Sequence, residues 1–181
     1  MSGLNCWKRF GASVAVSALM LASSPVVAGE TEDRFAITEL MDRYGIVHDF
    51  GSPEEYADLF TSDGEIGSGG RVLVKGREAL MAQARRDHEK YTIEIGPGRK
   101  ATSLMRHIVS NREVRLTGAD TAEGSCYVMT YVQDGDEGPK LLSIGRYEDR
   151  YRRENGAWRI SHRNIILDFG DQGLAKKLGF R

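Results

Sequence analysis

Four stretches of alternating apolar and polar residues decide the fold: LMRHIVSNREVRL (104–116), AEGSCYVMTYVQ (122–133), LLSIGRYEDRYRR (141–153) and WRISHRNIILDF (158–169). A period of two is typical of a strand that buries one face. Compact turn-forming segments separate the stretches, at 117–120, 134–138 and 154–156. The sequence therefore predicts four long strands joined as an antiparallel meander.

The residues before this meander predict helices. From 32 to 50, apolar residues recur every three or four positions and Gly51 follows, so we expect an amphipathic helix that ends there. The segment SPEE (52–55) has the order of a capping box with proline in the first turn, which predicts a short helix to about Phe60. A third helix is expected over 77–91, because cations near its end complement the helix dipole.

Shorter features connect these elements. We expect a turn at 61–64, a small hairpin over 65–74, and a short helix over 171–180 that covers the mouth or edge of the sheet. Helices that come first and hairpin-linked strands that follow indicate an α+β domain, with the helices packed on one face of a curved sheet.

The first 28 residues have the layout of an export signal. Lys8 and Arg9 precede an uncharged apolar segment, which closes with small residues at Val26 and Ala28. The segment is short for a membrane span and SSP (23–25) interrupts it, so we expect cleavage after Ala28 and not a retained anchor. The prediction is a signal peptide over 1–28, a single domain over 29–181, and a periplasmic or secreted location without membrane contact after cleavage.

Composition agrees with one ordinary globular domain. The 181 residues are 40% hydrophobic and include 25 Lys and Arg against 26 Asp and Glu. Residues 1–28 carry two of those cations and no anion, so the mature chain has a net charge of 23 minus 26, or −3. This charge supplies no positive field for a phosphate backbone, which argues against a nucleic-acid partner. Cys6 lies in the predicted signal, so Cys126 has no intrachain disulfide partner.

Most chemistry-bearing motifs have ordinary structural interpretations. The segment GSGG (67–70) is followed by neither Lys-Ser/Thr nor a helix start, so it fits a hairpin turn. Cys126 lies in mid-strand and is expected to be a core cysteine. The histidines at 48, 88, 107 and 162 lack the spacing of metal ligands, so no metal site is expected. The basic run 146–153 places Glu148, Arg150 and Arg152 on one face, which is expected to be a solvated, salt-bridged surface.

Three residues remain that can support catalysis without a metal. Tyr44 lies on the apolar face of the first predicted helix, Asp49 lies at the end of that helix, and His107 begins the first long strand. Each alone also has a structural interpretation, as a core aromatic, a helix-end charge and a bonded strand residue. On a straight helix Asp49 is about 140° around from Tyr44. Both can therefore face one cavity only if the helix end unwinds or the pocket wraps around it.

At these residues the chain resembles a known family. The run Tyr44-(x)4-Asp49 is followed by ADLFTSDG (57–64), GRE (76–78), RHIVSN (106–111), GRYED (145–149) and GAWRI (156–160). Together these segments look like the SnoaL-like branch of the nuclear transport factor 2-like superfamily, over nearly the whole mature chain. The resemblance implies a cone-shaped α+β barrel, in which a curved antiparallel sheet wrapped by three N-terminal helices surrounds a deep apolar pocket.

The nearest site pattern is that of scytalone dehydratase, bile-acid dehydratase and hexachlorocyclohexane dehydrochlorinase. In this group an Asp near the end of the first helix supports a strand His, and a Tyr or Lys five residues earlier lines the pocket. Asp49, His107 and Tyr44 match those positions, and Arg163 is similar to an Arg that the dehydrochlorinase places after the last-strand Trp. His162 has the same strand parity as that Trp, so in a regular strand only one of His162 and Arg163 points inward.

The resemblance implies a lyase that works without a cofactor and removes water or a halide from a small apolar cyclic molecule. Neutral His107 would take a proton from substrate carbon, Asp49 would fix the imidazole tautomer, and Tyr44 would hydrogen-bond the departing oxygen. Two alternatives stay open: a non-catalytic protein that binds a small hydrophobic molecule, and an isomerase with a carboxylate base like the ketosteroid isomerases. Members with this fold form dimers or trimers, so a homo-dimer or homo-trimer is expected.

Overall fold

The computed structural model describes residues 29–101, 105–134 and 137–179. The predicted signal peptide over 1–28 lies outside these residues. The elements are, in order, α1 (Glu30–Phe50), α2 (Pro53–Ala57), β1 (Phe60–Ser68), β2 (Arg71–Lys75), α3 (Arg77–Tyr91), β3 (Ile93–Gly96), β4 (Arg99–Ala101), β5 (Met105–Leu116), β6 (Thr121–Gln133), β7 (Pro139–Glu154), β8 (Ala157–Gly170) and α4 (Gln172–Lys177).

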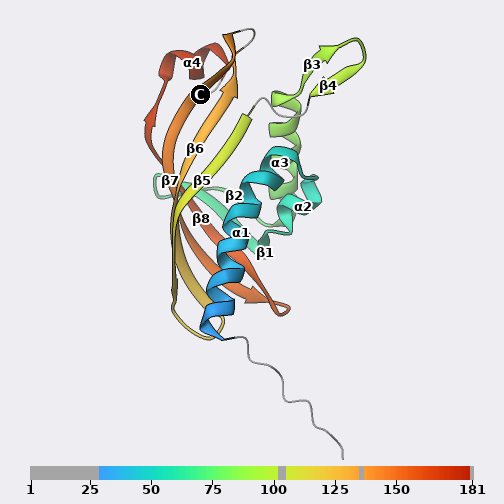
Figure 1. The fold of residues 1–181 in the computed structure, drawn as a ribbon. Coiled ribbons are helices and arrows are strands. Elements are labelled where there is room, and N and C mark those ends of the chain that lie inside the picture. Colours follow the sequence, from blue (N-terminus) through green and yellow to red (C-terminus); the bar gives the residue numbers. More distant parts are fainter. Residues whose placement is uncertain (1–28, 102–104, 135–136, 180–181) are drawn as a thin grey trace, which may run out of the picture.

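The predicted meander is confirmed, since β5, β6, β7 and β8 pair in sequence order and antiparallel (Figure 1). A six-stranded sheet of order β2-β1-β8-β7-β6-β5 contains them. β1 pairs with β8 in parallel, and the other strands pair antiparallel. The sheet is curved (Figure 1). It does not close into a barrel, because β2 and β5 form its two edges and do not pair with each other.

The three predicted helices lie beside the sheet as expected, although α2 ends at Ala57 and not at about Phe60, which begins β1. α1 packs along β5 and also contacts β8, whereas α3 contacts α2, β1 and β2 (Figure 1). The capping box of α2 is confirmed: the Ser52 side chain accepts from the backbone N–H of Glu55 at 3.1 Å, and the Glu55 carboxylate accepts from the backbone N–H of Ser52 at 2.8 Å. These caps satisfy N–H groups that the first turn leaves without a partner.

The segment between α2 and α3 differs in part from the prediction. The hairpin of β1 and β2 is confirmed, with Gly69 and Gly70 at positive φ in its turn. The turn expected at 61–64 is wrong, because these residues belong to β1, where the register with β8 shifts between Phe60 and Glu65. The backbone N–H of Ser62 finds its acceptor in the distant Glu154 carboxylate, a tertiary contact that local turn chemistry does not reveal. The small β3–β4 hairpin was not predicted either.

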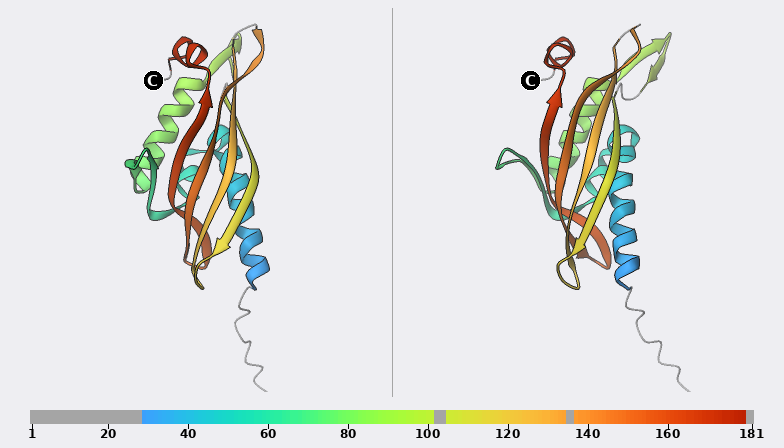
Figure 2. Two further views of the ribbon diagram at one scale, coloured as in Figure 1. Left: turned by 90° about the vertical axis from the view of Figure 1, so that its left-hand side faces the viewer. Right: turned by 60° about the vertical axis from the view of Figure 1, so that its left-hand side comes forward.

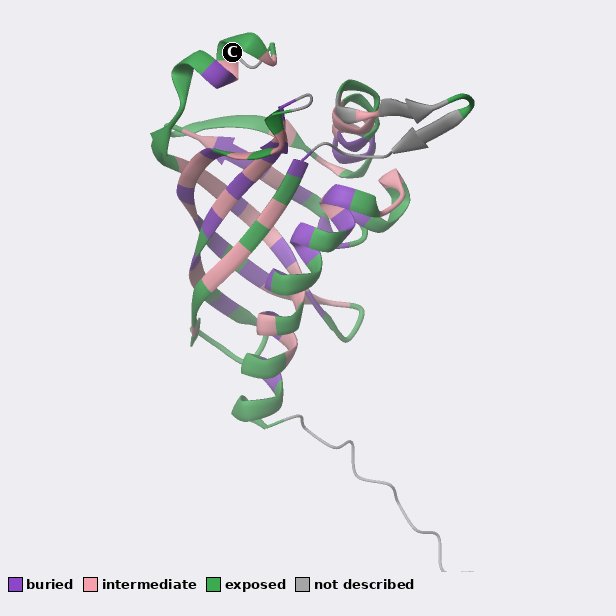
Figure 3. Cartoon of the chain, turned by 45° about the horizontal axis from the view of Figure 1, so that its top comes forward, coloured by how far each residue is buried: buried purple, intermediate pink, exposed green. Residues whose placement is uncertain are grey.

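The core lies between the helices and the sheet. Buried and exposed residues alternate along the strands, and α1 keeps its outer surface exposed (Figure 3). Cys126 is 2% exposed and unpaired, which confirms the predicted core cysteine. The principal buried hydrophobic residues are Ile37, Met41, Tyr44, Tyr56, Leu80, Val128, Tyr147, Tyr151 and Ile160.

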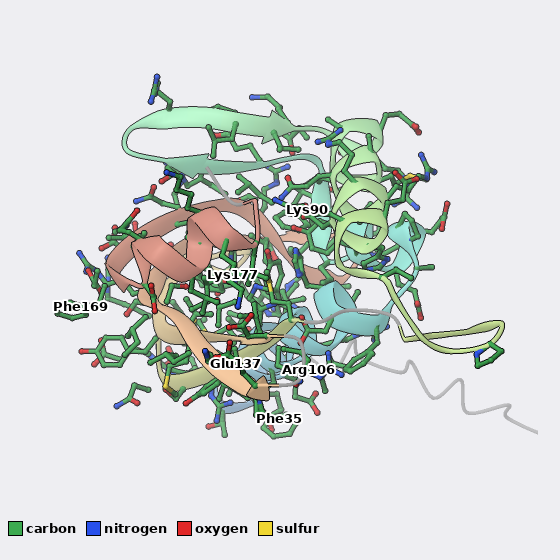
Figure 4. The ribbon with its side chains drawn as sticks, turned by 90° about the horizontal axis from the view of Figure 1, so that it is seen from above. Phe35, Lys90, Arg106, Glu137, Phe169 and Lys177 are labelled. Atoms are coloured by element: carbon green, nitrogen blue, oxygen red, sulfur yellow. The ribbon has the colours of Figure 1, made fainter. Side chains whose placement is uncertain are left out.

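A second, smaller core closes one end of the sheet. Leu174 of α4 packs with Met105, Val132 and Leu142, which confirms a C-terminal helix at the end of the sheet. Figure 4, viewed from above, shows Lys177 of this helix near Glu137, with Phe169 away from both. No helix in the described ranges is both long and apolar enough to cross a membrane.

Candidate active site

The end of α1 lies beside the start of β5, and this brings Asp49 and His107 together. Their side chains are only 3% and 10% exposed, respectively. Nδ1 of His107 lies 2.7 Å from Asp49 Oδ1, and the backbone N–H of His107 donates to Asp49 Oδ2 at 2.9 Å. Asp49 therefore holds both the strand and the imidazole ring. Nε2 of His107 has no hydrogen-bond partner among the described residues.

Gly45 makes this close approach possible. A Cβ atom at this position would lie 2.8 Å from the carbonyl oxygen of His107 and 3.6 Å from the His107 Cβ. A glycine inside a helix costs about 1 kcal/mol relative to alanine. Gly45 is therefore explained by the close contact between α1 and β5, because a larger side chain at this position would push the two elements apart.

Burial and hydrogen bonding set the charge of the two partners. Burial lowers the pKa of His107 and the nearby His48 lowers it further, so the net shift is downward although the bond to Asp49 opposes it. Burial raises the pKa of Asp49, but the hydrogen bonds from His107 and the nearby His48 ring, 3.9 Å away, outweigh burial and bring that pKa to about 2. At neutral pH the pair is therefore a carboxylate and a neutral imidazole. The ring proton lies on Nδ1, facing the carboxylate, and the lone pair of Nε2 is free.

A β-bulge in β8 decides the orientation of His162 and Arg163. The pairing of β8 with β7 skips Ser161, so the alternation of side chains shifts by one position. Ile160 and Arg163 are consequently both buried, with 0% exposure. His162 points to the other face, where its Nδ1 lies 2.9 Å from Glu65.

Arg163 is a buried cation whose Nη1 has no hydrogen-bond partner among the described residues. Its Nε and Nη2 donate to Asp149 at 2.9 and 2.5 Å, and the hydroxyl of Tyr151 donates to the same carboxylate at 2.6 Å. The central carbon of the guanidinium lies 3.8 Å from the Tyr44 ring centroid and 4.1 Å from that of Tyr147. Nη1 is buried and has no partner in the part of the chain that the structure describes. An N–H group of this kind can donate to an electronegative ligand atom.

Tyr44 and Asp49 both face the interior, although α1 remains helical to Phe50. The Tyr44 hydroxyl lies 3.1 Å from that of Tyr56 in α2, and its ring stacks on His48 with centroids 5.7 Å apart. Asp49 instead faces β5. The helix end is therefore enclosed from both sides and does not unwind, which is the second of the two arrangements expected from the helical angle.

His48 joins this site without any signal in the histidine spacing. His48, Asp49 and His107 offer ligand atoms within 4.8 Å of one another, a group that could hold a metal ion. The spacing of histidines along the sequence did not predict this group, because His48 and His107 are far apart in the sequence and meet only where β5 packs on α1. Ligands around tetrahedral zinc lie roughly 3.3 Å apart, whereas His107 Nδ1 and Asp49 Oδ1 are 2.7 Å apart. The geometry therefore fits a hydrogen-bonded pair better than a metal site.

Sequence reasoning also missed Tyr56, Tyr147 and Asp149. The alternation in the basic run 146–153 contains a signal for Asp149, because it places this residue opposite Arg150 and Arg152. That outward face is confirmed as polar and salt-bridged, with Arg152 donating to Asp63 at 2.5 Å. No comparable signal marks Tyr56, which comes from a separate helix.

A groove of about 1020 Å³ lies on the outer face of the sheet, and its lining includes Arg71, Glu148, Arg150 and His162. The β1–β2 hairpin flanks this face and extends away from the side that carries α1 (Figure 2). None of the four predicted site residues lines this groove. Gly69 and Gly70 form the hairpin turn, as predicted for the GSGG segment, whereas Gly67 and Ser68 belong to β1. Gly67 and Gly70 line the groove.

The open, curved sheet with helices on one face is typical of a cone-like α+β domain. The buried pair of Asp49 and His107 lies at the end of its first helix. Residues 29–164 match the SnoaL-like domain family, and the chain belongs to that family. A comparison with curated proteins gave no match.

Solved structures are similar over most of the chain. A nuclear transport factor 2-like protein with a cystatin-like fold from Novosphingobium aromaticivorans is 25% identical, with coverage of 83% of this chain and 91% of its own and a TM-score of 0.63. A candidate scytalone dehydratase from the same organism is 20% identical, with coverage of 77% and 86% and a TM-score of 0.61. A type 2 hexachlorocyclohexane dehydrochlorinase is 20% identical, with coverage of 78% and 88% and a TM-score of 0.62. These similarities confirm the predicted fold.

Proposed function

We propose that this protein is a cofactor-independent lyase that eliminates water or a halide from a small, largely apolar cyclic molecule. The observation that carries the proposal is the bond of 2.7 Å between His107 Nδ1 and Asp49, with Nε2 of the same ring left without a described partner. A neutral imidazole with a free lone pair and a fixed tautomer has the form that a general base requires.

In the proposed reaction, Nε2 of His107 takes a proton from a substrate carbon. The electron pair of that C–H bond forms the new C=C bond, and the bond to the leaving group on the adjacent carbon breaks. Asp49 stabilises the imidazolium that forms, because its carboxylate already accepts the proton on Nδ1. The whole step needs no electron acceptor and no metal.

Arg163 and Tyr44 are the proposed partners of the departing atom. The free Nη1 group of Arg163 can donate a hydrogen bond to a leaving oxygen or halide, and the Tyr44 ring lies directly against the same guanidinium. Two structural neighbours carry names that fit such chemistry, a candidate scytalone dehydratase and a hexachlorocyclohexane dehydrochlorinase. We also propose that the protein binds a small hydrophobic molecule and forms a homo-dimer or homo-trimer, as its membership of the SnoaL-like domain family suggests.

Mass spectrometry of reactions with alicyclic alcohols, halides and enones tests the proposal. We expect loss of water or acid from at least one substrate. His107→Ala and Asp49→Asn should each reduce turnover by roughly 10²–10⁴-fold, with folding checked by circular dichroism. Near wild-type turnover in both variants would overturn the mechanism. Isomerisation that survives the loss of His107 would favour a carboxylate base, and binding without turnover of any compound would favour a non-catalytic protein.

A further inference from the structure

We propose that His48, held by Asp87, is the general acid of this site and that its presence directs the enzyme toward hydroxylated substrates in preference to chlorinated ones. This inference rests on the proposed elimination by His107. The second His–Asp pair consists of His48 from α1 and Asp87 from α3, and it lies beside the pair of Asp49 from α1 and His107 from β5.

The geometry places the two imidazoles against each other. The ring centroids of His48 and His107 lie 4.5 Å apart, with planes inclined by 81°. Two rings at this separation can both reach neighbouring atoms of one substrate, one the hydrogen on carbon and the other the oxygen on the adjacent carbon. The His48 side chain is 11% exposed, so the ring borders the site without full burial.

His48 is held on several sides. Its Nε2 lies 3.5 Å from Asp87 Oδ2, and its Nδ1 lies 3.9 Å from Asp49 Oδ1. The rings of Tyr44 and Tyr56 lie 5.7 and 5.3 Å away, centroid to centroid. In addition, the backbone carbonyl of His48 is 2.9 Å from His88 Nε2, which fastens the end of α1 to α3.

The charges around the ring favour an imidazolium. Burial lowers the pKa of His48, but Tyr44 and the carboxylates of Asp49 and Asp87 outweigh it and raise that pKa to about 10. The end of a helix also favours a cation. The charged His48 in turn lowers the pKa of His107. The two histidines thus hold opposite roles at neutral pH, one as acid and the other as base.

The proton balance of the step is complete. His107 Nε2 gains the proton from carbon while the hydroxyl group leaves with the C–O electron pair and takes the proton on His48 Nδ1, so that water departs. Nε2 of His48 faces Asp87, whereas Nδ1 lies 3.9 Å from Asp49, beyond hydrogen-bonding distance. The enzyme is left with protonated His107 and neutral His48, and exchange with solvent returns both to their starting states. Chloride is a stable anion and leaves without a proton, so only the alcohol reaction needs His48.

A comparison of two leaving groups tests this role. Elimination rates are measured for an alicyclic alcohol and the corresponding chloride with the wild type, His48→Gln and Asp87→Asn, and with His162→Gln on the outer face as the matched control. We expect His48→Gln to lose roughly 10²–10⁴-fold on the alcohol and less than about tenfold on the chloride. Asp87→Asn should show the same preference with a smaller loss, and the control should match the wild type.

The outcomes separate this inference from the proposed function. Equal losses on both substrates would show that His48 has only a structural role. Unchanged alcohol turnover in His48→Gln would show that His48 has no role in the reaction. Either result overturns the proposal of His48 as the general acid but leaves His107 as the proposed base. A wild type that eliminates neither group overturns both proposals. Independently of any substrate, ¹⁵N spectra of the wild type at pH 8 should show both His48 ring nitrogens protonated, and a neutral His48 at that pH overturns the inference.

Discussion

The buried ion pair of Arg163 and Asp149 provides a prediction that does not depend on catalysis. Both side chains have 0% exposure, and the guanidinium donates two hydrogen bonds to the carboxylate. Arg163→Met keeps much of the apolar stem but removes the charge. The substitution leaves Asp149 buried with the Tyr151 hydroxyl as its remaining donor, so a carboxylate stays in the core without a compensating cation.

The size of the effect follows from this burial. Breaking a buried pair by removing one partner costs about 3–5 kcal/mol. With a urea m-value of about 2 kcal/mol per M, this loss lowers the midpoint of unfolding by roughly 2 M. Urea unfolding followed by circular dichroism measures the shift. The double variant Arg163→Met with Asp149→Leu should lie closer to the wild type than Arg163→Met alone, because no unpaired charge remains.

Arg152→Met on the same sheet is the matched control. Arg152 pairs with Asp63 across the exposed surface, where the two side chains are 42% and 62% exposed. Such a pair contributes about 0–1 kcal/mol, so this variant should unfold close to the wild type. If Arg163→Met costs no more than Arg152→Met, the argument that the interior holds an essential charge is refuted.

Three further predictions concern the site and the N-terminus. The pKa of Asp49 is lowered to about 2 from the ordinary 3.8, so the ionised carboxylate stabilises the fold above pH 4 and this stabilisation is lost as the pH falls through 2. The free energy of unfolding of Asp49→Asn should therefore lack roughly 2 kcal/mol of the pH dependence that the wild type shows in acid. Identical acid-unfolding curves for the two proteins would contradict this prediction. Gly45→Ala should lower the melting temperature despite its better helix propensity, because its Cβ would meet the His107 carbonyl; a more stable variant would show that α1 and β5 are not in tight contact. We also propose export, so mass spectrometry of the secreted or periplasmic protein should give a chain that starts at Gly29, and an uncleaved N-terminus would contradict this.

Much of the fold was predictable because its pattern is local. The period-two stretches and their turns define β5 to β8, and the capping box defines α2. The segment 61–64 was not predictable, because its polar residues are typical of a turn, whereas in the structure they lie within β1 and the backbone N–H of Ser62 finds its acceptor in Glu154. Local sequence cannot report a partner that lies 92 residues away.

The candidate site was predictable only in part. Asp49 and His107 were candidates from the sequence, and the resemblance implied that they act together. Their contact depends on Gly45, whose role is visible only when β5 lies against α1. The choice of Arg163 over His162 depends on the bulge at Ser161, which reverses the strand parity. His48 stood next to Asp49 in the sequence, but its role needs Asp87 from α3, and only tertiary packing brings the two together.

The central claim is that Asp49 holds His107 as a neutral base. The ¹⁵N imidazole spectrum of the wild-type protein at pH 7 tests it most directly, with assignment by comparison with His107→Gln. The account predicts a neutral His107 that carries its proton on Nδ1, with Nε2 unprotonated, and a loss of this tautomer preference in Asp49→Asn. A His107 that is doubly protonated at pH 7, or that carries its proton on Nε2, would contradict the account, because Nε2 could not then take a proton from carbon.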